Sequence, residues 1–306
     1  MDRTAAGHRP WRAGLRGGEI TVAGSVMLLQ SAIAACLAVF MLVLGAPSLA
    51  QAAACDQLFA GGQAPALLNA RLAQRTTALC NSAYAALASG VTRGPLWSAE
   101  HLTADSLASA RSTPRHGVFH EDERLPPDDR AMVSDYARSG YDRGHMTPSG
   151  DMPGPEAQQQ SFSLANIVPQ TPQLNRGVWE GIESAVRRLA EDHGALYVVT
   201  GPVFQGDQLQ ALKGRVLVPS STWKAIYDPS MPGAGAYMCT NVSRPTCTYL
   251  SIAALERETG IDPFPAVSIA VKQTQMRLPS PEPSHDRRSG QKHPSPHHGL
   301  FAPLFQ

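Results

Sequence analysis

The sequence predicts an α+β protein with a central, mostly antiparallel sheet flanked by helices. Strand signals are strongest at residues 196–204 and 215–226, where Val, Ile, Tyr and Trp are frequent. The run Pro-Gly-Ala-Gly at residues 232–235 marks a turn between strands. Helical signals occur at residues 174–183 and 251–259, and a glycine ends the second of these helices. The presence of both element types in one chain supports the α+β class.

Individual segments differ in their apolar content. Residues 196–204 are almost continuously apolar, so we expect a central strand there. A further strand is expected at residues 96–100. Residues 111–129 are polar and contain proline, which predicts a loop.

Length and charge limit the classes of function. The chain has 306 residues and a formal net charge of +1, and it is long enough to bury a substantial core. A nearly balanced charge excludes a basic coat over the whole surface. Any site for a polyanion must therefore be local.

The first 52 residues have the design of a secretory signal peptide. A basic start is followed by an apolar run, densest at residues 33–44, and by the small-residue pattern Ala50-Gln51-Ala52. Cleavage is expected after Ala52, which predicts a periplasmic or secreted protein. The alternative is an uncleaved N-terminal membrane anchor, because apolar residues extend back to Ile20. No stable membrane partner is expected unless this segment stays uncleaved.

Four of the five cysteines lie outside the segment that we expect to be removed. An even number of cysteines in an exported chain indicates two disulfides. Three connectivities are possible in principle, and the short-range pairing Cys55–Cys80 with Cys239–Cys247 is the natural expectation.

The remaining chain divides by composition. Residues 53–95 are rich in Ala and Leu, which predicts a helical N-terminal extension. Residues 96–270 form the main domain. Residues 271–306 are rich in Pro, Ser and His and lack an apolar period, so we expect a disordered tail.

Two motifs at the centre of the main domain carry residues suited to chemistry. The first is Asp142-Arg143-Gly144-His145, in which a glycine separates a cation from a base. We expect Gly144 to allow a backbone bend that turns both side chains toward one space. The second motif begins at Asn175 and places a tryptophan and Glu183 four and eight residues further on. In a helix this spacing puts the amide and the carboxylate on one side.

Spacing alone leaves other interpretations open for each residue. A single histidine is more often a structural hydrogen-bonding group than a catalyst. Asn175 is equally compatible with a helix N-cap, and Glu183 with a solvated position.

The literal strings are more specific than the spacing. Asp142-Arg143-Gly144-His145, followed by Asn175-x-Gly177-x-Trp179-x-x-Ile182-Glu183, resembles the DNA/RNA non-specific endonucleases, the ββα-metal nucleases that include mitochondrial endonuclease G. The family's Asn-Ile-x-Pro-Gln run lies between them. A looser resemblance extends over residues 96–267 and includes Tyr197 to Pro202, Val218-Pro219, Trp223-Lys224, Leu255-Glu256 and Thr259-Gly260.

This resemblance implies a catalytic unit of a β-hairpin followed by a helix, with His145 on the hairpin side and Asn175 at the helix start. It implies that His145 is the general base and that Asn175 is the direct ligand of Mg²⁺, with Mn²⁺ as the other hard ion. Glu183 would hold the metal through water. Arg143 would grip a phosphate oxygen with its planar guanidinium group.

Other family positions are matched less closely. An upstream phosphate-contacting arginine is expected at Arg115, with Arg111 as the alternative. Asn166 is expected to bind substrate or to hydrogen-bond the site from nearby, and Asp142 to orient its loop.

The function that the resemblance implies is that of an exported, Mg²⁺-dependent, sugar-non-specific endonuclease. Its partners would be DNA and RNA without marked sequence preference, because phosphate and sugar contacts discriminate bases poorly. Dimers occur in the resembling family, so a homodimer is also an expectation. The alternatives are a nucleic-acid-binding protein on an inactive nuclease scaffold, and a hydrolase of another phosphodiester such as a lipid head group.

Overall fold

In the computed structural model, which describes residues 55–281, the chain builds a seven-stranded sheet in which every neighbouring pair of strands is antiparallel. In spatial order the strands are β12 (Cys247–Leu250), β11 (Ala234–Thr240), β10 (Ser221–Tyr227), β7 (Ala195–Val203), β4 (Gly94–Thr103), β3 (Ala85–Ser89) and β2 (Thr76–Cys80). The α+β class with a mostly antiparallel sheet is confirmed. The strand expected at residues 196–204 lies at the centre, between β10 and β4.

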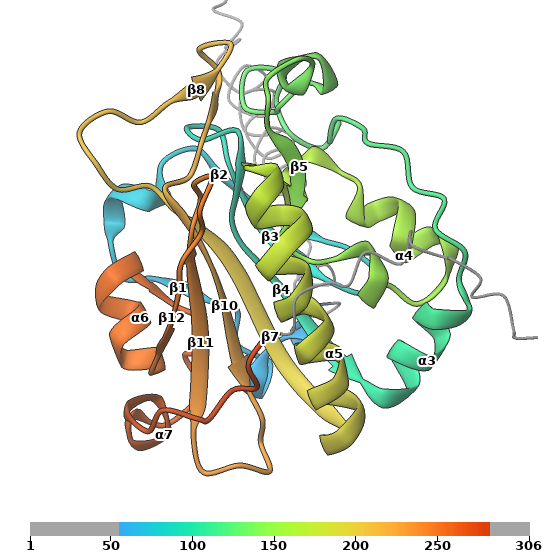
Figure 1. The fold of residues 1–306 in the computed structure, drawn as a ribbon, viewed down its shortest axis with the longest axis vertical. Helices are drawn as coiled ribbons and strands as arrows, with labels where there is room; N and C mark the ends of the chain where they lie inside the picture. The colour runs from blue at the N-terminus through green and yellow to red at the C-terminus, as the bar shows by residue number, and fades with distance from the viewer. Residues whose placement is uncertain (1–54, 282–306) are drawn as a thin grey trace, which may run out of the picture. The chain divides into compact units, whose positions relative to one another are not determined.

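Both faces of this sheet are covered, which explains the apolar character of β7. Its alternating side chains belong to two different cores. Val198 packs with the core under α3 (Ala104–Ser112) and α5 (Glu180–His193), whereas Val199 packs with the core under α6 (Ile252–Thr259). Figure 1 shows α5 running along the sheet over β4 and β7.

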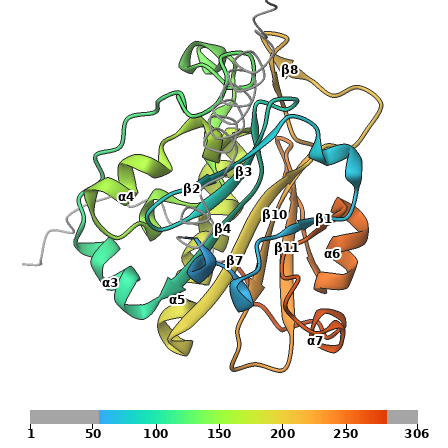
Figure 2. The ribbon, with the colours of Figure 1, turned by 180° about the vertical axis from the view of Figure 1, so that it is seen from behind.

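The N-terminal segment differs from expectation. The helical extension expected at residues 53–95 is corrected for its described part, residues 55–95, since β2 and β3 form a hairpin that extends the sheet beyond β4. Ala85, Ala86 and Ala88 are buried there. Alanine favours helices, but this preference is weak and pairing with a neighbouring strand overrides it. Figure 2 shows β2 and β3 beside β4. The folded domain therefore begins well before residue 96.

Two further boundaries are corrected. The segment 215–226 is not one strand, because Pro219 and its neighbours separate β9 (Val216–Leu217) from β10. We expected a disordered tail from residue 271, but the ordered chain extends further. Helix α7 (Ile269–Gln273) includes residue 271, and Met276 and Leu278 are buried. Residues 282–306 lie outside the described part of the chain, as do residues 1–54 and with them the expected signal peptide or anchor.

A two-stranded hairpin stands apart from the main sheet and leads into α5. In it β5 (Asp142–His145) pairs with β6 (Ile167–Gln170), so that His145 lies opposite Ile167. The chain then enters η7 (Leu174–Trp179), a segment of π-helical hydrogen bonding that continues into α5. The expected order of hairpin followed by helix is present.

The other elements are short. The strand pairs are β1 (Ala66–Leu67) with β13 (Ile261–Asp262), and β8 (Ala211–Leu212) with β9. The remaining helix is α4 (Gly154–Ser161), and the 3₁₀ turns are η1 (Asp56–Leu58), η2 (Ala60–Gly62), η3 (Ala70–Ala73), η4 (Val133–Tyr136), η5 (Ser149–Asp151) and η6 (Leu164–Asn166).

Two disulfides are formed with the expected pairing. Cys55 bonds Cys80 and ties the N-terminal turn to the end of β2. Cys239 bonds Cys247 across directly paired positions of β11 and β12. Within residues 55–281, no helix is both long enough and apolar enough to cross a membrane.

Candidate active site

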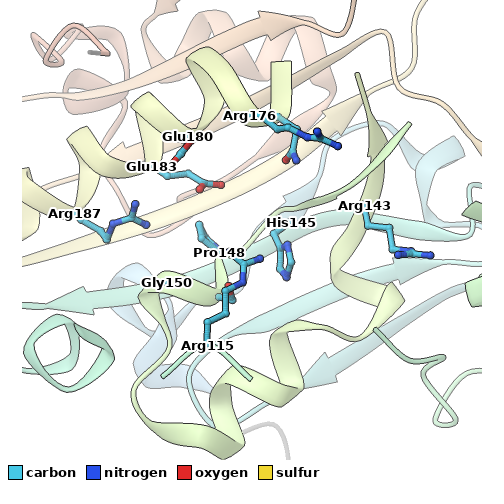
Figure 3. Close-up of a pocket in the computed structure, with 11 residues that line it drawn as sticks. Arg115, Arg143, His145, Pro148, Gly150, Arg176, Glu180, Glu183 and Arg187 are labelled. Atoms are coloured by element: carbon cyan, nitrogen blue, oxygen red, sulfur yellow. The ribbon is translucent and has the colours of Figure 1, made fainter. Parts of the chain in front are cut away.

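The two sequence motifs line one cavity of about 310 Å³. Its walls come from β5, from the loop after it, from η7 and from the start of α5 (Figure 3). The lining residues are Arg115, Arg143, His145, Pro148, Ser149, Gly150, Asn175, Arg176, Glu180, Glu183 and Arg187. Four arginines face two glutamates, so the cavity suits an anion although the whole chain is nearly neutral.

His145 ends β5 and lies between two aromatic rings. Its ring centroid is 5.5 Å from that of Phe119 and 4.9 Å from that of Phe162, and its side chain is buried. Its Nε2 is buried without a hydrogen-bond partner. Burial, with a smaller contribution from the positive charge of Arg115, lowers the pKa of His145 to about 3. The imidazole is therefore neutral at neutral pH, the form that accepts a proton.

The glycine of the first motif has a different role from the one expected. Gly144 lies in a regular strand position opposite Val168, not at a bend with positive φ. A β-carbon at this position would overlap the side chain of Gln170. Gly144 is thus required by the close approach of Gln170, whose Nε2 donates a hydrogen bond to Thr222 on the main sheet.

Asn175 is held by the first residue of β5. Its Nδ2 donates a hydrogen bond of 3.1 Å to Oδ2 of Asp142. The alternative in which Asn175 caps the helix is wrong, because the helix begins at Pro172 and Thr171 caps it by accepting a hydrogen bond at Oγ1 from the Leu174 amide. The bond to Asp142 uses one amide N–H and does not involve Oδ1, a neutral oxygen of the kind that Mg²⁺ accepts.

Asp142 is itself fixed by an ion pair. Arg176 donates from Nε and Nη2 to the two carboxylate oxygens of Asp142, over 2.7 and 2.6 Å. Burial alone would raise the pKa of Asp142, but the hydrogen bonds from Arg176 and Asn175 outweigh it and lower the pKa. Asp142 therefore stays ionised and orients the Asn175 amide, whereas the role expected for it was to orient its own loop.

Glu183 is a half-buried acid in the wall of the cavity. Burial raises its pKa to about 7, against the opposing positive charges of Lys224 and Arg187. A carboxylate whose charge is this poorly solvated favours a nearby cation. Glu183, Glu180 and Arg187 are carried by the first two turns of α5, and Figure 3 shows the Glu183 carboxylate pointing into the cavity.

The donor set fits a hydrated hard cation. Asn175 and Glu183 supply an amide oxygen and a carboxylate to one cavity. Among residues 55–281 there is no group of three or more His, Cys, Asp and Glu side chains placed to hold a metal. A hard cation held by these two oxygen donors would complete its coordination with water.

The two arginines expected to contact phosphate both line the cavity. The Arg143 guanidinium stacks over Phe119 at 4.9 Å and lies 5.9 Å from the Tyr136 ring. Arg115 is exposed and lies over the ring of Phe162 at 5.6 Å. The alternative, Arg111, forms an ion pair with Glu191 instead and does not line the cavity.

The expectation that Asn166 binds substrate is corrected. Its side chain is fully buried and does not line the cavity. Its Oδ1 accepts from Ser98 and from the Thr147 amide, and its Nδ2 donates to the carbonyl oxygens of Thr147 and Ser161. Asn166 thus fixes the loop that follows His145 and acts on the site only through that loop.

Sequence reasoning missed Arg187 and Arg176. Arg187 donates to Asp151 over 2.7 Å and to Ser184 over 3.0 Å, and it contributes positive charge next to Glu183. Its position four residues after Glu183 continues the spacing from Asn175 by one more helical turn, and this periodicity was the available signal. No sequence pattern predicted the ion pair between Arg176 and Asp142.

Comparisons with known proteins agree with this geometry. A sequence model of a family described as DNA/RNA non-specific endonuclease matches residues 67–269. Nuclease C1 from Cunninghamella echinulata var. echinulata is 34% identical over 194 residues, which cover 57% of this chain and 77% of that protein. A nuclease from Nostoc sp. is 39% identical over 141 residues, or 45% of this chain and 50% of that protein.

Two further likenesses come from a mitochondrial protein and from a solved structure. Nuclease EXOG, mitochondrial, from Danio rerio is 34% identical over 196 residues, or 57% of each protein. The chain thus spans about half the length of the Nostoc and Danio rerio proteins. A chain in the crystal structure of the EndoG/EndoGI complex superposes with a TM-score of 0.56 at 30% identity, which covers 60% of this chain and 84% of that one.

Proposed function

The chain belongs to the DNA/RNA non-specific endonuclease family, whose reaction is phosphodiester hydrolysis, and from this premise we propose that it is an exported, Mg²⁺-dependent endonuclease acting on both DNA and RNA. The observation that carries the proposal is the cavity in which a neutral buried imidazole, an oriented amide and a half-buried carboxylate meet four arginines.

The residues of the cavity have different roles in hydrolysis. The phosphodiester carries negative charge, and the side chains of Arg143 and Arg115 attract it into the cavity. The neutral imidazole of His145 takes a proton from the attacking water. An anionic phosphate near the ring also raises the low pKa of His145, which makes it a stronger base when substrate is bound.

The metal would be held by Asn175 directly and by Glu183 through water. When bound, Mg²⁺ supplies positive charge to the phosphoryl group and to the leaving oxygen. Asp142 keeps the Asn175 amide in one orientation, so that its oxygen faces the ion. Mn²⁺ is accepted by the same hard oxygen donors and is expected to substitute.

Substrate breadth and export follow from different features. The cavity offers arginines to phosphate, and phosphate contacts carry no base sequence, which supports action on DNA and RNA alike. Two disulfides support export, because such bonds persist in oxidising compartments. Homodimerisation stays a prediction, and light scattering on the purified chain would test it.

Plasmid nicking tests the proposal. The purified protein should convert supercoiled DNA to nicked circles and should degrade single-stranded RNA. EDTA should stop both reactions, and excess Mg²⁺ should restore them. The matched control is His145→Ala, prepared in parallel to exclude a contaminating nuclease. Binding of DNA without cutting in any divalent metal would instead identify an inactive scaffold.

A further inference from the structure

Lys224 is a fully buried cation beneath the active site. It lies on β10, the neighbour of the central strand β7, opposite Thr200. Only 1% of the residue is exposed. Its Nζ donates hydrogen bonds to Thr200 Oγ1 over 2.7 Å and to the Met146 carbonyl oxygen over 3.4 Å. The ammonium group does not line the catalytic cavity, so it cannot touch substrate there.

The contacts of Lys224 join the two halves of the site. Met146 directly follows His145, so the carbonyl that Lys224 binds lies one residue beyond the strand that carries the base. The same Nζ lies 5.9 Å from the ring of Trp179, which is fully buried. Trp179 lies midway between Asn175 and Glu183, four residues from each. One side chain thus contacts both the segment of the base and the helix of the metal-binding residues.

The positive charge of Lys224 also acts on two nearby carboxyl groups. Its ammonium is close enough to influence both Glu183 and Glu100, a carboxylic acid on β4 that is 1% exposed. Both oxygens of Glu100 lack hydrogen-bond partners. Arg187 is already paired with Asp151. Lys224 Nζ, in contrast, donates its hydrogen bonds to the uncharged oxygens of Thr200 and Met146, which leaves its charge to balance Glu183.

We propose that Lys224 is a positioning residue for metal binding, which fixes the spacing between His145 and the helix carrying Asn175 and Glu183 and supplies buried positive charge beside Glu183. The proposal rests on the proposed nuclease function, because it assigns a role within that same site. The competing explanation is a lysine that merely fills the core. If Lys224 is a positioning residue, its replacement changes metal affinity in a protein that remains folded. If it only fills the core, metal affinity in the folded variant is unchanged.

Two substitutions at this position separate charge from shape. Lys224→Met keeps an unbranched apolar chain and removes the charge, whereas Lys224→Arg restores a cation. Glu100→Gln is the matched control. Burial raises the pKa of Glu100 well above its ordinary value, which favours the uncharged acid, and glutamine is the neutral isostere of that acid. Folding is checked by circular dichroism and thermal unfolding.

The decisive readout is Mn²⁺ binding by the whole purified protein, measured by calorimetry, alongside kcat and KM for plasmid DNA. In Lys224→Met we expect Mn²⁺ affinity and kcat to fall about tenfold or more, as for other residues that orient metal ligands, with little change in KM. Lys224→Arg should recover most of both losses, and Glu100→Gln should match the wild type. Affinity and kcat within twofold of wild type in folded Lys224→Met would overturn the proposal.

A second variant covers a failure of Lys224→Met to fold. Thr200→Val keeps the lysine but removes its shortest hydrogen bond, so metal affinity should again fall, and unchanged affinity would overturn the proposal. The Mn²⁺ measurement also separates this inference from the proposed function. A wild-type protein that binds Mn²⁺ but cuts no nucleic acid would refute the nuclease proposal alone.

Discussion

Asn175 donates a hydrogen bond from Nδ2 to Oδ2 of Asp142 over 3.1 Å. This bond joins the start of the helix to the first residue of β5, three positions before His145 at the end of the same strand. It also fixes the orientation of the amide, because only the amide nitrogen can donate to the carboxylate. The geometry of the candidate metal site therefore depends on a carboxylate that is not itself among the expected ligands.

Removing this carboxylate should weaken metal binding. In Asp142→Ala the Asn175 amide loses its fixed orientation, so the Mg²⁺ concentration for half-maximal nicking should rise about 10–100-fold, the range typical of groups that orient metal ligands. Arg176→Met is the control, because it removes the ion pair to Asp142 and leaves the Asn175 bond. An equal rise in both variants would mean that the ion pair, not the amide orientation, matters.

Local signals predicted the parts of the fold that depend on local causes. Helix α6 was recognised from its pattern and from Gly260, which adopts a left-handed φ of 68° at the helix end. Strand β7 was recognised because both of its faces are buried. The Ala-rich hairpin of β2 and β3 was not, because its strands depend on pairing with β4, which no local preference reveals.

In the site, too, features with local causes were predicted and features that depend on distant segments were not. His145, Arg143, Asn175 and Glu183 were found from two short motifs, and the structure brings all four to one cavity. The burial of Asn166 was missed, because it depends on segments far away in sequence such as Ser98. The role of Gly144 was misread for a related reason, since the glycine is required by a side chain from another strand.

Replacing the base should abolish catalysis without abolishing metal binding. His145→Ala is expected to lower the nicking rate about 10²–10⁴-fold, the usual effect of removing a positioned base. Calorimetric Mn²⁺ affinity should stay within about threefold of wild type, because His145 is not assigned as a ligand. Wild-type cutting by the purified variant would show that another group takes the proton.

Burial of His145 should make stability depend on pH. The unfolded imidazole binds a proton near pH 6.5, whereas burial lowers the folded pKa to about 3. Between these values only the unfolded state is protonated, so stability is lost as pH falls through this window. At pH 4.5 the loss from this residue should be about 2–3 kcal/mol, from the two pH units below the unfolded pKa.

His145→Gln measures this contribution, since glutamine does not titrate. Urea unfolding of the metal-free proteins at pH 7.5 and 4.5 would give the difference, and the other acids of the chain affect both proteins alike. The drop in unfolding free energy between the two pH values should be smaller in His145→Gln. Equal drops would show that His145 is protonated in the folded protein at pH 4.5.

Arg143 should not be replaceable by lysine. Its planar guanidinium stacks on Phe119 and can grip two phosphate oxygens, neither of which an ammonium group reproduces. Arg143→Lys should lower kcat/KM for plasmid DNA about tenfold, which corresponds to ~1.4 kcal/mol of lost transition-state binding. Steady-state nicking at constant ionic strength gives kcat/KM. If Arg143→Lys had the wild-type kcat/KM, Arg143 would contribute only its positive charge.

The most direct test of the whole account is a Mg²⁺ titration of nicking by Asn175→Asp, with Asn175→Ala beside it. Aspartate keeps an oxygen near the same place and adds a negative charge, which attracts the metal but repels the scissile phosphate. We predict a lower half-saturating Mg²⁺ concentration together with partial activity for Asn175→Asp, and loss of most activity for Asn175→Ala. Full activity with an unchanged metal titration in Asn175→Asp would contradict the assignment of Asn175 as the metal ligand.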